Sequence, residues 1–276
     1  MTLEDLHKQY KSRLRVATFR ILNNKFDDEL SHEQLIDYHL GYDEQMKRWP
    51  EKPIEVLSSY LTGSKKFKQN DSSDEEFIKN DKNFKNNKRF KTESKSISEN
   101  YKPLKISKNT KIADIGCGTC KLSENVLNFY KKSQIEGFDE KKLESKKNNQ
   151  TPKFFNYDIH PVNDSIIKAQ SNKIPVKDSY FDIAVYCLSL MAENLTSDIK
   201  EAHRIIKPSG NLLIAELTSR ISPYQFIKHL ESYNFKLNKI ILSNDFFFVI
   251  DLIKIETNEE MKPEKIVLKP AVYKKR

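Results

Sequence analysis

The sequence predicts an α/β protein with a mostly parallel, doubly wound sheet of seven strands and an N-terminal helical extension. Three observations predict this fold. Apolar strand-like runs alternate with helix-patterned segments from residue 111 onward, which is typical of a parallel sheet covered on both faces. A glycine turn follows the first run, and a tight connection joins the last two runs. The last two strands are therefore predicted to form an antiparallel hairpin, so the sheet is mixed.

The predicted strands are the runs 111–117, 134–139, 153–159, 180–190, 211–218, 236–243 and 246–255. After the first run, apolar residues at Leu122, Val126 and Tyr130 lie on one side of a predicted helix. Two more helices are predicted at 197–207, ended by Pro208-Ser209-Gly210, and at 222–234.

Four segments are predicted: an N-terminal helical region for docking substrate or RNA (1–62), an insertion (63–100), the α/β domain (101–257) and a basic tail (258–276). Residues 3–21 form an amphipathic helix pattern whose other face is basic, through Lys8, Lys11, Arg13, Arg15 and Arg20. This face could contact phosphates or be solvated. The insertion is rich in Lys, Asn, Ser and acidic residues and nearly free of aliphatic residues, so we expect it to be disordered.

Composition limits the function classes. The 276 residues carry 48 basic and 39 acidic side chains, a net charge of +9, which favours either a polyanionic partner or simple solubility. With three cysteines we expect a reducing compartment. Cys117 and Cys120 form a C-x-x-C within the glycine turn, without a second cysteine pair, and we expect neither metal binding nor redox function there. The N-terminus lacks the apolar core of a secretory signal, and no segment approaches the roughly 20 apolar residues of a membrane span.

The candidate ligand site follows from the strand ends. In doubly wound sheets, ligands bind beyond the carboxyl ends of the strands. Gly116 and Gly118 end the first predicted strand and leave no side chain between the turn and a ligand, although any tight strand-to-helix turn could use glycines. Asp139 ends the second strand, about 20 residues further on, where a carboxylate can accept hydrogen bonds from ribose hydroxyls. Asp158 and Ile159 end the third strand and would contact adenine, although each carboxylate could instead cap a helix.

The turn lacks the third glycine of the dinucleotide motif, because Thr119, Cys120 and Lys121 follow Gly118. A single G-x-G after an acidic strand residue, together with the terminal hairpin, indicates instead a Rossmann-like class I methyltransferase that uses S-adenosylmethionine.

A more specific resemblance is carried by motifs outside residues 63–100. They are Tyr38-His39-x-Gly41-Tyr42, Lys47-x-Trp49-Pro50, Ala113-Asp114-x-Gly116-Cys117-Gly118, Phe138-Asp139, Tyr157-Asp158-Ile159, Phe181-Asp182-x-Ala184-Val185-x-Cys187-Leu188-Ser189-Leu190-Met191, Glu201-Ala202-x-Arg204, Ala215-Glu216-x-x-Ser219-Arg220 and Asn244-x-Phe246-Phe247. With these motifs the sequence resembles the ribosomal RNA-processing protein 8 family.

The resemblance implies a nuclear, nucleolar enzyme that methylates ring nitrogen 1 of an adenosine in large-subunit ribosomal RNA, acting on that RNA or a pre-ribosomal particle. Chromatin-associated proteins are further possible partners. It implies cofactor contacts at His39, Gly116, Asp139, Asp158, Ile159 and Cys187, of which His39 could otherwise be a helix-packing residue. Two departures stand out: Thr119 replaces a commonly acidic residue, and an extra polar stretch at 160–173 could move the adenine contact toward Ser171 or Asn172.

We assign Glu216 as a candidate for stabilising the positive charge of the methylated product, with Arg220 and Asn244 as RNA-contacting or loop-positioning groups. Glu216 could equally hold a loop. Two rival functions remain open at this point. One is a cofactor-binding chromatin or RNA adaptor with little turnover, and the other is a methyltransferase that acts on a protein or small molecule.

Overall fold

A computed structural model describes residues 2–23, 30–64, 104–135, 151–192, 194–257, 261 and 263–271. In order, its elements are α1 (Leu3–Asn23), α2 (His32–Met46), α3 (Pro53–Thr62), β1 (Lys111–Ile115), α7 (Lys121–Ile135), β2 (Lys153–Asp158), β3 (Ile166–Lys168), β4 (Phe181–Cys187), α8 (Thr196–Ile205), β5 (Ile206–Leu217), α9 (Pro223–Glu231), β6 (Phe235–Ser243) and β7 (Phe247–Lys254). None of the helices in these ranges is long and apolar enough to cross a membrane. The insertion predicted at 63–100 lies outside the described residues from residue 65 onward.

The strands form one seven-stranded sheet in the order β3-β2-β1-β4-β5-β7-β6. The first five strands pair in parallel, while β7 runs antiparallel to both β5 and β6. This confirms the predicted Rossmann-like sheet with its C-terminal hairpin. The hairpin is inserted so that β7, the later strand, lies next to β5.

One predicted strand differs from the structure. The run 134–139 was predicted as the second strand, but Gln134 and Ile135 are the last residues of α7, because no Gly or Pro interrupts the helix before Gly137. Residues 136–150 are not described. In the described sheet β2, which was predicted as the third strand, pairs directly with β1. The outer position belongs to β3, a three-residue strand within the polar stretch 160–173.

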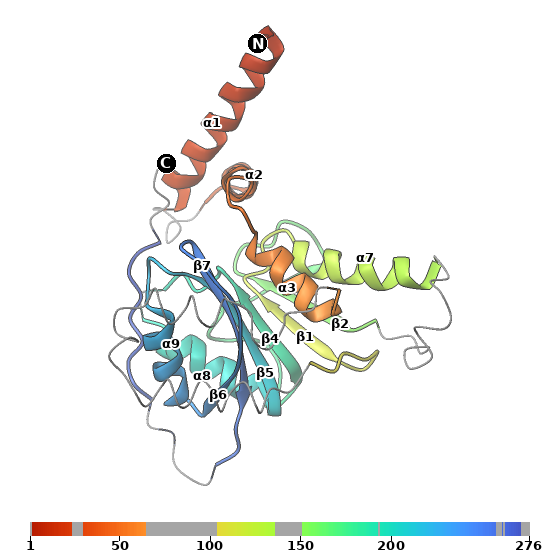
Figure 1. The fold of residues 1–276 in the computed structure, drawn as a ribbon, viewed down its shortest axis with the longest axis vertical. Helices are drawn as coiled ribbons and strands as arrows, with labels where there is room; N and C mark the ends of the chain where they lie inside the picture. The colour runs from red at the N-terminus through yellow and green to blue at the C-terminus, as the bar shows by residue number, and fades with distance from the viewer. Residues whose placement is uncertain are drawn as a thin grey trace.

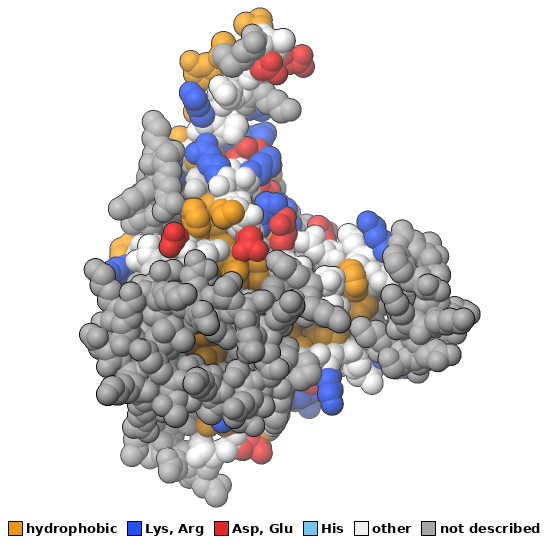
Figure 2. All heavy atoms as spheres, viewed as in Figure 1, with side chains coloured by type: hydrophobic (Ala, Val, Ile, Leu, Met, Phe, Trp, Pro, Cys, Tyr) orange, Lys and Arg blue, Asp and Glu red, His pale blue; other side chains and the backbone are white. Residues whose placement is uncertain are grey.

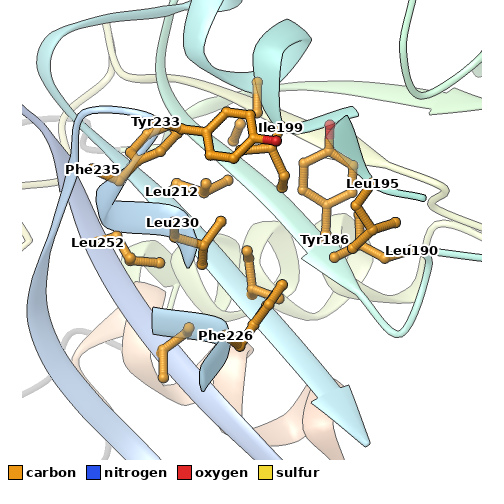
Figure 3. Packing of buried hydrophobic residues seen from close by; sticks show 14 of the residues in the cluster. Tyr186, Leu190, Leu195, Ile199, Leu212, Phe226, Leu230, Tyr233, Phe235 and Leu252 are labelled. Carbon is orange, nitrogen blue, oxygen red and sulfur yellow. The ribbon is translucent and has the colours of Figure 1, made fainter. Parts of the chain in front are cut away.

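Two apolar layers hold helices against the sheet, α8 and α9 on one face and α3 and α7 on the other (Figure 1). On the first face, Ile199 of α8 and Phe226 and Leu230 of α9 are fully buried. They pack with strand residues such as Tyr186 and Leu212 (Figure 3). Full burial of aliphatic or aromatic side chains stabilises a fold by about 1.5–3 kcal/mol each.

The N-terminal helices lie above this body, with α1 projecting from it (Figure 1). A capping box of Ser31 and Gln34 begins α2, and Pro53 begins α3, which ends at Gly63 in the left-handed conformation. α1 packs on α2 through Phe19, whose ring contacts Tyr38 and Tyr42. The helices approach closely at Gly41, where an added Cβ would lie 2.4 Å from the carbonyl oxygen of Arg15.

Residues 263–271, within the segment delimited as a basic tail, cross the loops that follow β4 and β5. Ile266 and Leu268 are buried in the core. The backbone N–H of Leu195 donates to the carbonyl of Ile266, and that of Lys269 donates to the carbonyl of Arg220. We call residues 263–271 the C-terminal strap.

A buried polar cluster links α3 to the antiparallel part of the sheet. The carboxylate of Asp251 on β7 accepts hydrogen bonds from Tyr60 Oη (2.7 Å), Asn211 Nδ2 (2.7 Å) and Asn238 Nδ2 (2.6 Å). Burial raises the pKa of Asp251 to about 6, although the three donors oppose the shift.

The raised pKa of Asp251 gives stability a pH dependence. Because the folded-state pKa lies above the ordinary 3.8, the stabilising contribution of protonated Asp251 is complete below that value and is lost as the pH rises through about 6. The unfolding free energy of the wild type, relative to Asp251→Asn, should therefore fall by roughly 2 kcal/mol between about pH 4 and about pH 8. Urea unfolding of both proteins at each pH measures this difference in unfolding free energy. Tyr60→Phe, which removes one donor to the charged form, should steepen the fall, and parallel wild-type and Asp251→Asn profiles would contradict the assignment.

Candidate cofactor site

The glycine turn after β1 is fixed by the end of β2. The backbone N–H groups of Gly116 and Cys117 both donate to the carbonyl of Tyr157, at 2.8 and 3.0 Å. Gly118 N–H donates to Asp158 Oδ2 at 2.9 Å, and His160 N–H donates to Asp158 Oδ1 at 2.9 Å. The Asp158 carboxylate is thereby held at the carboxyl edge of the sheet, and each of its oxygens keeps a lone pair for a further donor.

A cleft of about 620 Å³ opens at this edge. It is lined by the glycine turn, the ends of β2 and β4, the turn after β3, the start of α8 and one side of α2. The cleft thus lies where ligands bind in doubly wound sheets.

The two glycines of the turn have positive φ angles, 70° at Gly116 and 56° at Gly118, which favour glycine. A Cβ on Gly116 would lie 2.4 Å from Ser189 Cβ, whereas one on Gly118 would meet only the ring of His39, at 3.1 Å. Ser189 itself is fixed, since its Oγ donates to the carbonyl of Ile115 at 2.6 Å.

α2 closes one side of the cleft with Tyr38, His39, Tyr42 and Asp43. Asp43 forms an ion pair with Lys121 of α7, which ties the helix to the glycine turn. Burial lowers the pKa of His39, against the attraction of Asp158. The imidazole over Gly118 is therefore neutral at neutral pH.

Asp114 is the most deeply buried acidic group in the cleft. It is 2% exposed, lines the cleft, and its Oδ2 has no hydrogen-bond partner among the described residues. Burial raises the pKa of Asp114 to about 8. A buried carboxyl oxygen without a donor is costly, so this position fits a ligand that brings a cationic or N–H group.

The turn after β3 forms the opposite end of the cleft, with Ala169, Gln170, Ser171 and Asn172 in its lining. Ser171 Oγ donates to Asp198 Oδ1 at the start of α8. Burial raises the pKa of Asp198.

The structure brings five of the six predicted cofactor contacts together. His39, Gly116, Asp158, Ile159 and Cys187 all line the cleft. Asp139 lies outside the described residues. Because β2 pairs directly with β1, Asp158 ends the strand neighbouring the glycine turn, the place that the sequence prediction gave to Asp139.

Glu216 and Arg220 do not line the cleft. Their side chains are 1% and 3% exposed and form a buried ion pair at 2.9 Å. Arg220 Nη1 also donates to the carbonyl of Leu190 at 2.6 Å, and its Nε donates to the carbonyl of Lys269 at 2.8 Å. Burial raises the pKa of Glu216 to about 7, although Arg220 opposes the shift. The pair joins the loop after β4, the end of β5 and the C-terminal strap.

Asn244 is likewise outside the cleft lining and shapes the β6–β7 turn. Its Oδ1 accepts the backbone N–H groups of Phe246 and Phe247 at 2.9 and 3.0 Å. These two phenylalanines contact the ring of Trp49, with 5.7 and 5.5 Å between centroids. Asn244 therefore fixes the turn against the segment between α2 and α3.

Sequence reasoning missed Tyr42, Asp43 and Lys121 as parts of the site, and it placed Asp114 and Ser189 at the strand ends without giving their side chains a role. A charged residue inside the apolar run 111–115 was a usable signal for Asp114, because buried charges need partners. The dense aromatic residues of 38–49 are a usable signal for a docking segment, but they do not specify the surface.

The sheet order, the hairpin and the cleft at the strand ends define the class I methyltransferase fold. The model of a family described as "Hypothetical methyltransferase" matches residues 5–149 and 136–276. The chain belongs to this family.

Curated relatives bear the family name that the sequence motifs suggested. Ribosomal RNA-processing protein 8 of Caenorhabditis elegans is 29% identical over 277 residues, covering 96% of this chain and 62% of that protein. The "25S rRNA (adenine(645)-N(1))-methyltransferase" of Schizosaccharomyces pombe is 26% identical over 290 residues, covering 99% of this chain and 73% of that protein. The predicted resemblance is confirmed. The chain spans less than two thirds of the C. elegans relative.

Among solved structures, the 1,6-didemethyltoxoflavin-N1-methyltransferase of Burkholderia thailandensis aligns with a TM-score of 0.40 and 11% identity, covering 54% of this chain and 72% of that one.

The two glycines should differ in their tolerance of a side chain. Gly116→Ala drives a Cβ into Ser189 at a positive φ, so we expect a loss of about 3 kcal/mol in unfolding free energy. Gly118→Ala meets only the His39 ring, at 3.1 Å, and should lose about 1 kcal/mol. Urea unfolding of both variants checks this, with Gly116→Ala/Ser189→Gly expected to recover part of the loss. Equal losses in the two single variants would contradict the packing described.

Proposed function

We propose that this protein is an S-adenosylmethionine-dependent methyltransferase that modifies ring nitrogen 1 of an adenosine in large-subunit ribosomal RNA. The observation that carries the proposal is the cleft, in which the glycine turn, the fixed Asp158 carboxylate and His39 of α2 converge. Family membership and the names of the relatives support the reaction and the substrate.

The polar groups that line the cleft fit the cofactor. The remaining lone pairs of Asp158 suit ribose hydroxyls, and the unpartnered Oδ2 of Asp114 suits the cationic amino group of the methionine portion. The turn at 169–172, with Ile159, would flank the adenine, in agreement with the expected shift toward Ser171 or Asn172. When bound, S-adenosylmethionine supplies an electrophilic sulfonium methyl group.

The chain's own contribution is positioning. Ring nitrogen 1 of adenine has an in-plane lone pair, so attack on a methyl group needs no general base. The residues of the β4 end that line the cleft, Cys187, Leu188 and Met191, would hold the target base in line. Burial raises the pKa of the Cys187 thiol, which keeps it a neutral packing group. Orientation of this kind supplies a large part of the rate of group transfer.

We propose positioning roles for Glu216, Arg220 and Asn244, in place of direct contact with substrate. Arg220 holds the carbonyl of Leu190 in the loop after β4. Glu216 keeps the guanidinium in place. Asn244 holds the β6–β7 turn through the hydrogen bonds that its Oδ1 accepts from Phe246 and Phe247.

The basic face of α1 is suited to RNA phosphates. Lys and Arg side chains gather along this projecting helix (Figure 2), with Lys11 and Arg13 exposed. Phosphate contacts position a nucleic acid without reading its sequence. With ribosomal RNA or a pre-ribosomal particle as its partner, the protein would act in the nucleus and nucleolus.

An adaptor with little turnover is a second candidate, favoured by one observation. α1 exposes an apolar stripe in which Leu3, Tyr10 and Leu14 are 85%, 65% and 70% exposed, as a helix that docks a protein would. Chromatin-associated proteins stay a prediction for such a partner.

Methyl transfer tests the proposal. With labelled S-adenosylmethionine and unmodified large-subunit ribosomal RNA, the wild type should produce 1-methyladenosine, identified by mass spectrometry of nucleosides. Asp158→Ala should lose cofactor binding and transfer because its carboxylate fixes Gly118. Asp139→Ala is the matched comparison, since the sequence prediction gave the ribose to Asp139. Loss of binding in Asp139→Ala with normal binding in Asp158→Ala would reverse the assignment, and tight binding without transfer by the wild type would favour the adaptor.

Arg220→Lys tests the positioning role. Lysine keeps the charge but cannot donate to Leu190 and Lys269 from a rigid fork. We expect kcat for methyl transfer to fall about tenfold while the affinity for S-adenosylhomocysteine changes less than about twofold. Arg204→Lys is a matched control, because Arg204 also bonds carbonyls and carboxylates but lies away from the cleft. It should lower stability without changing kcat. An equal effect of the two substitutions on kcat would contradict the role.

A further inference from the structure

The two cysteines of the glycine turn form a close pair behind the cleft. Cys117 Sγ and Cys120 Sγ are 3.9 Å apart, and the backbone N–H of Cys120 donates to the carbonyl of Cys117 at 3.0 Å. Their residues are 8% and 4% exposed, packed with Ile166 and Val162. The mechanism proposed above uses neither thiol.

The surroundings of Cys120 favour its thiolate. The contact with Cys117 lowers the pKa of the Cys120 thiol, and Ser165 Oγ, 3.8 Å away, adds to the effect, whereas burial, Glu124 and Asp158 oppose it. The same interaction raises the pKa of Cys117. Cys120 also begins α7, where its carbonyl accepts the N–H of Glu124 at 3.0 Å, and helix N-termini stabilise thiolates. The pair therefore consists of an activated sulfur and a neutral thiol beside it.

This pair is built into the turn that shapes the cleft. Cys117 lines the cleft, its N–H is held by Tyr157, and the next residue, Gly118, is held by Asp158. Cys120 has a positive φ of 62°, an unusual conformation for a residue with a side chain. A disulfide between the two sulfurs would therefore act directly on the segment that carries these backbone contacts.

We propose that Cys117 and Cys120 are an oxidative modification site at which a hydroperoxide closes a reversible disulfide, and that closure weakens binding in the adjoining cleft. The Cys120 thiolate attacks the peroxide, an S–O bond forms, the O–O bond breaks, and the leaving oxygen departs as water or an alcohol after protonation. The Cys117 sulfur then displaces the sulfenic oxygen as water, and the S–S bond forms. The two thiols lose two electrons and the peroxide gains them.

Closure brings the sulfurs from 3.9 Å to about 2.05 Å. The two residues are joined through Gly118 and Thr119, so closure acts on the turn at the point where Gly118 meets Asp158. A ligand bound to the undistorted turn should oppose closure by the same factor by which closure weakens the ligand, because coupling between two binding equilibria is reciprocal. This second half of the inference rests on the proposed function, since its ligand is the cofactor product.

The disulfide is tested directly by mass spectrometry. Trypsin cleavage after Lys111 and Lys121 gives one peptide that contains both cysteines, and Cys187 falls in another. The reduced full-length protein is exposed to hydrogen peroxide, alkylated and digested. We expect the peptide to lose two hydrogens and to escape alkylation, and dithiothreitol to restore both alkylation sites. Cys120→Ser should abolish this product, and Cys187→Ser should retain it. Sulfinic acid without disulfide, or two freely alkylated thiols after treatment, would overturn the proposal.

The coupling is tested by calorimetry with S-adenosylhomocysteine on reduced, oxidised and re-reduced protein. We expect about tenfold weaker binding after oxidation, recovery after reduction, and slower oxidation of the ligand-bound protein. Unchanged affinity in a protein shown to carry the disulfide would overturn the coupling. If even the reduced protein fails to bind, the proposed function fails, while the peptide readout still decides the disulfide.

Discussion

The joint between the end of β2 and the glycine turn is the contact on which the site depends. One carbonyl, that of Tyr157, accepts two consecutive N–H groups of the turn, and the carboxylate that follows it accepts a third. The turn can form this joint because Gly116 and Gly118 adopt positive φ angles. The positive φ angles of the turn, the parallel pairing of β1 with β2 and the Asp158 carboxylate thus meet at one point, and the cleft forms around it.

Segments far from this joint in the sequence complete the cleft. α2 reaches over the turn and is tied to it through Asp43 and Lys121. The C-terminal strap reaches the other side through Arg220, which connects it to the carbonyl of Leu190. The central sheet alone would therefore leave the two walls of the cleft without support.

The sequence was sufficient for the architecture and for part of the site. Apolar runs, the glycine pair and the final hairpin predicted the mixed sheet, because each is a local pattern with a local physical cause. The run 134–139 was predicted as a strand, but its first two residues end α7 and the rest lie outside the described residues. The acidic side chain that bonds the glycine turn lies 40 residues after Gly118, whereas the sequence pattern led us to expect about 20. β3 has three residues and is too short to show the alternation of apolar and polar residues that predicts a strand.

The rest of the site depends on long-range contacts that no local pattern encodes. His39 was assigned from family resemblance alone, because the helix that carries it reaches Gly118 only through tertiary packing. Glu216 was predicted to stabilise the product charge or hold a loop, and Arg220 to contact RNA or position a loop. Their buried ion pair, outside the cleft lining, involves the strap through the carbonyl of Lys269. For Asp114 the sequence did carry a local signal, an acidic residue within an apolar run. Only the cleft shows that this carboxyl group faces a ligand site.

The strap has a consequence for synthesis of the protein on the ribosome. Arg220 is translated 49 residues before Lys269, its partner in the strap. During that interval a nascent chain can form the β1 turn and β4, but the guanidinium that restrains the loop after β4 lacks one of its carbonyl acceptors. A chain that ends before Lys269 would therefore keep the Arg220 contacts to Leu190 and Glu216 but would lack the carbonyl through which the strap holds the same guanidinium.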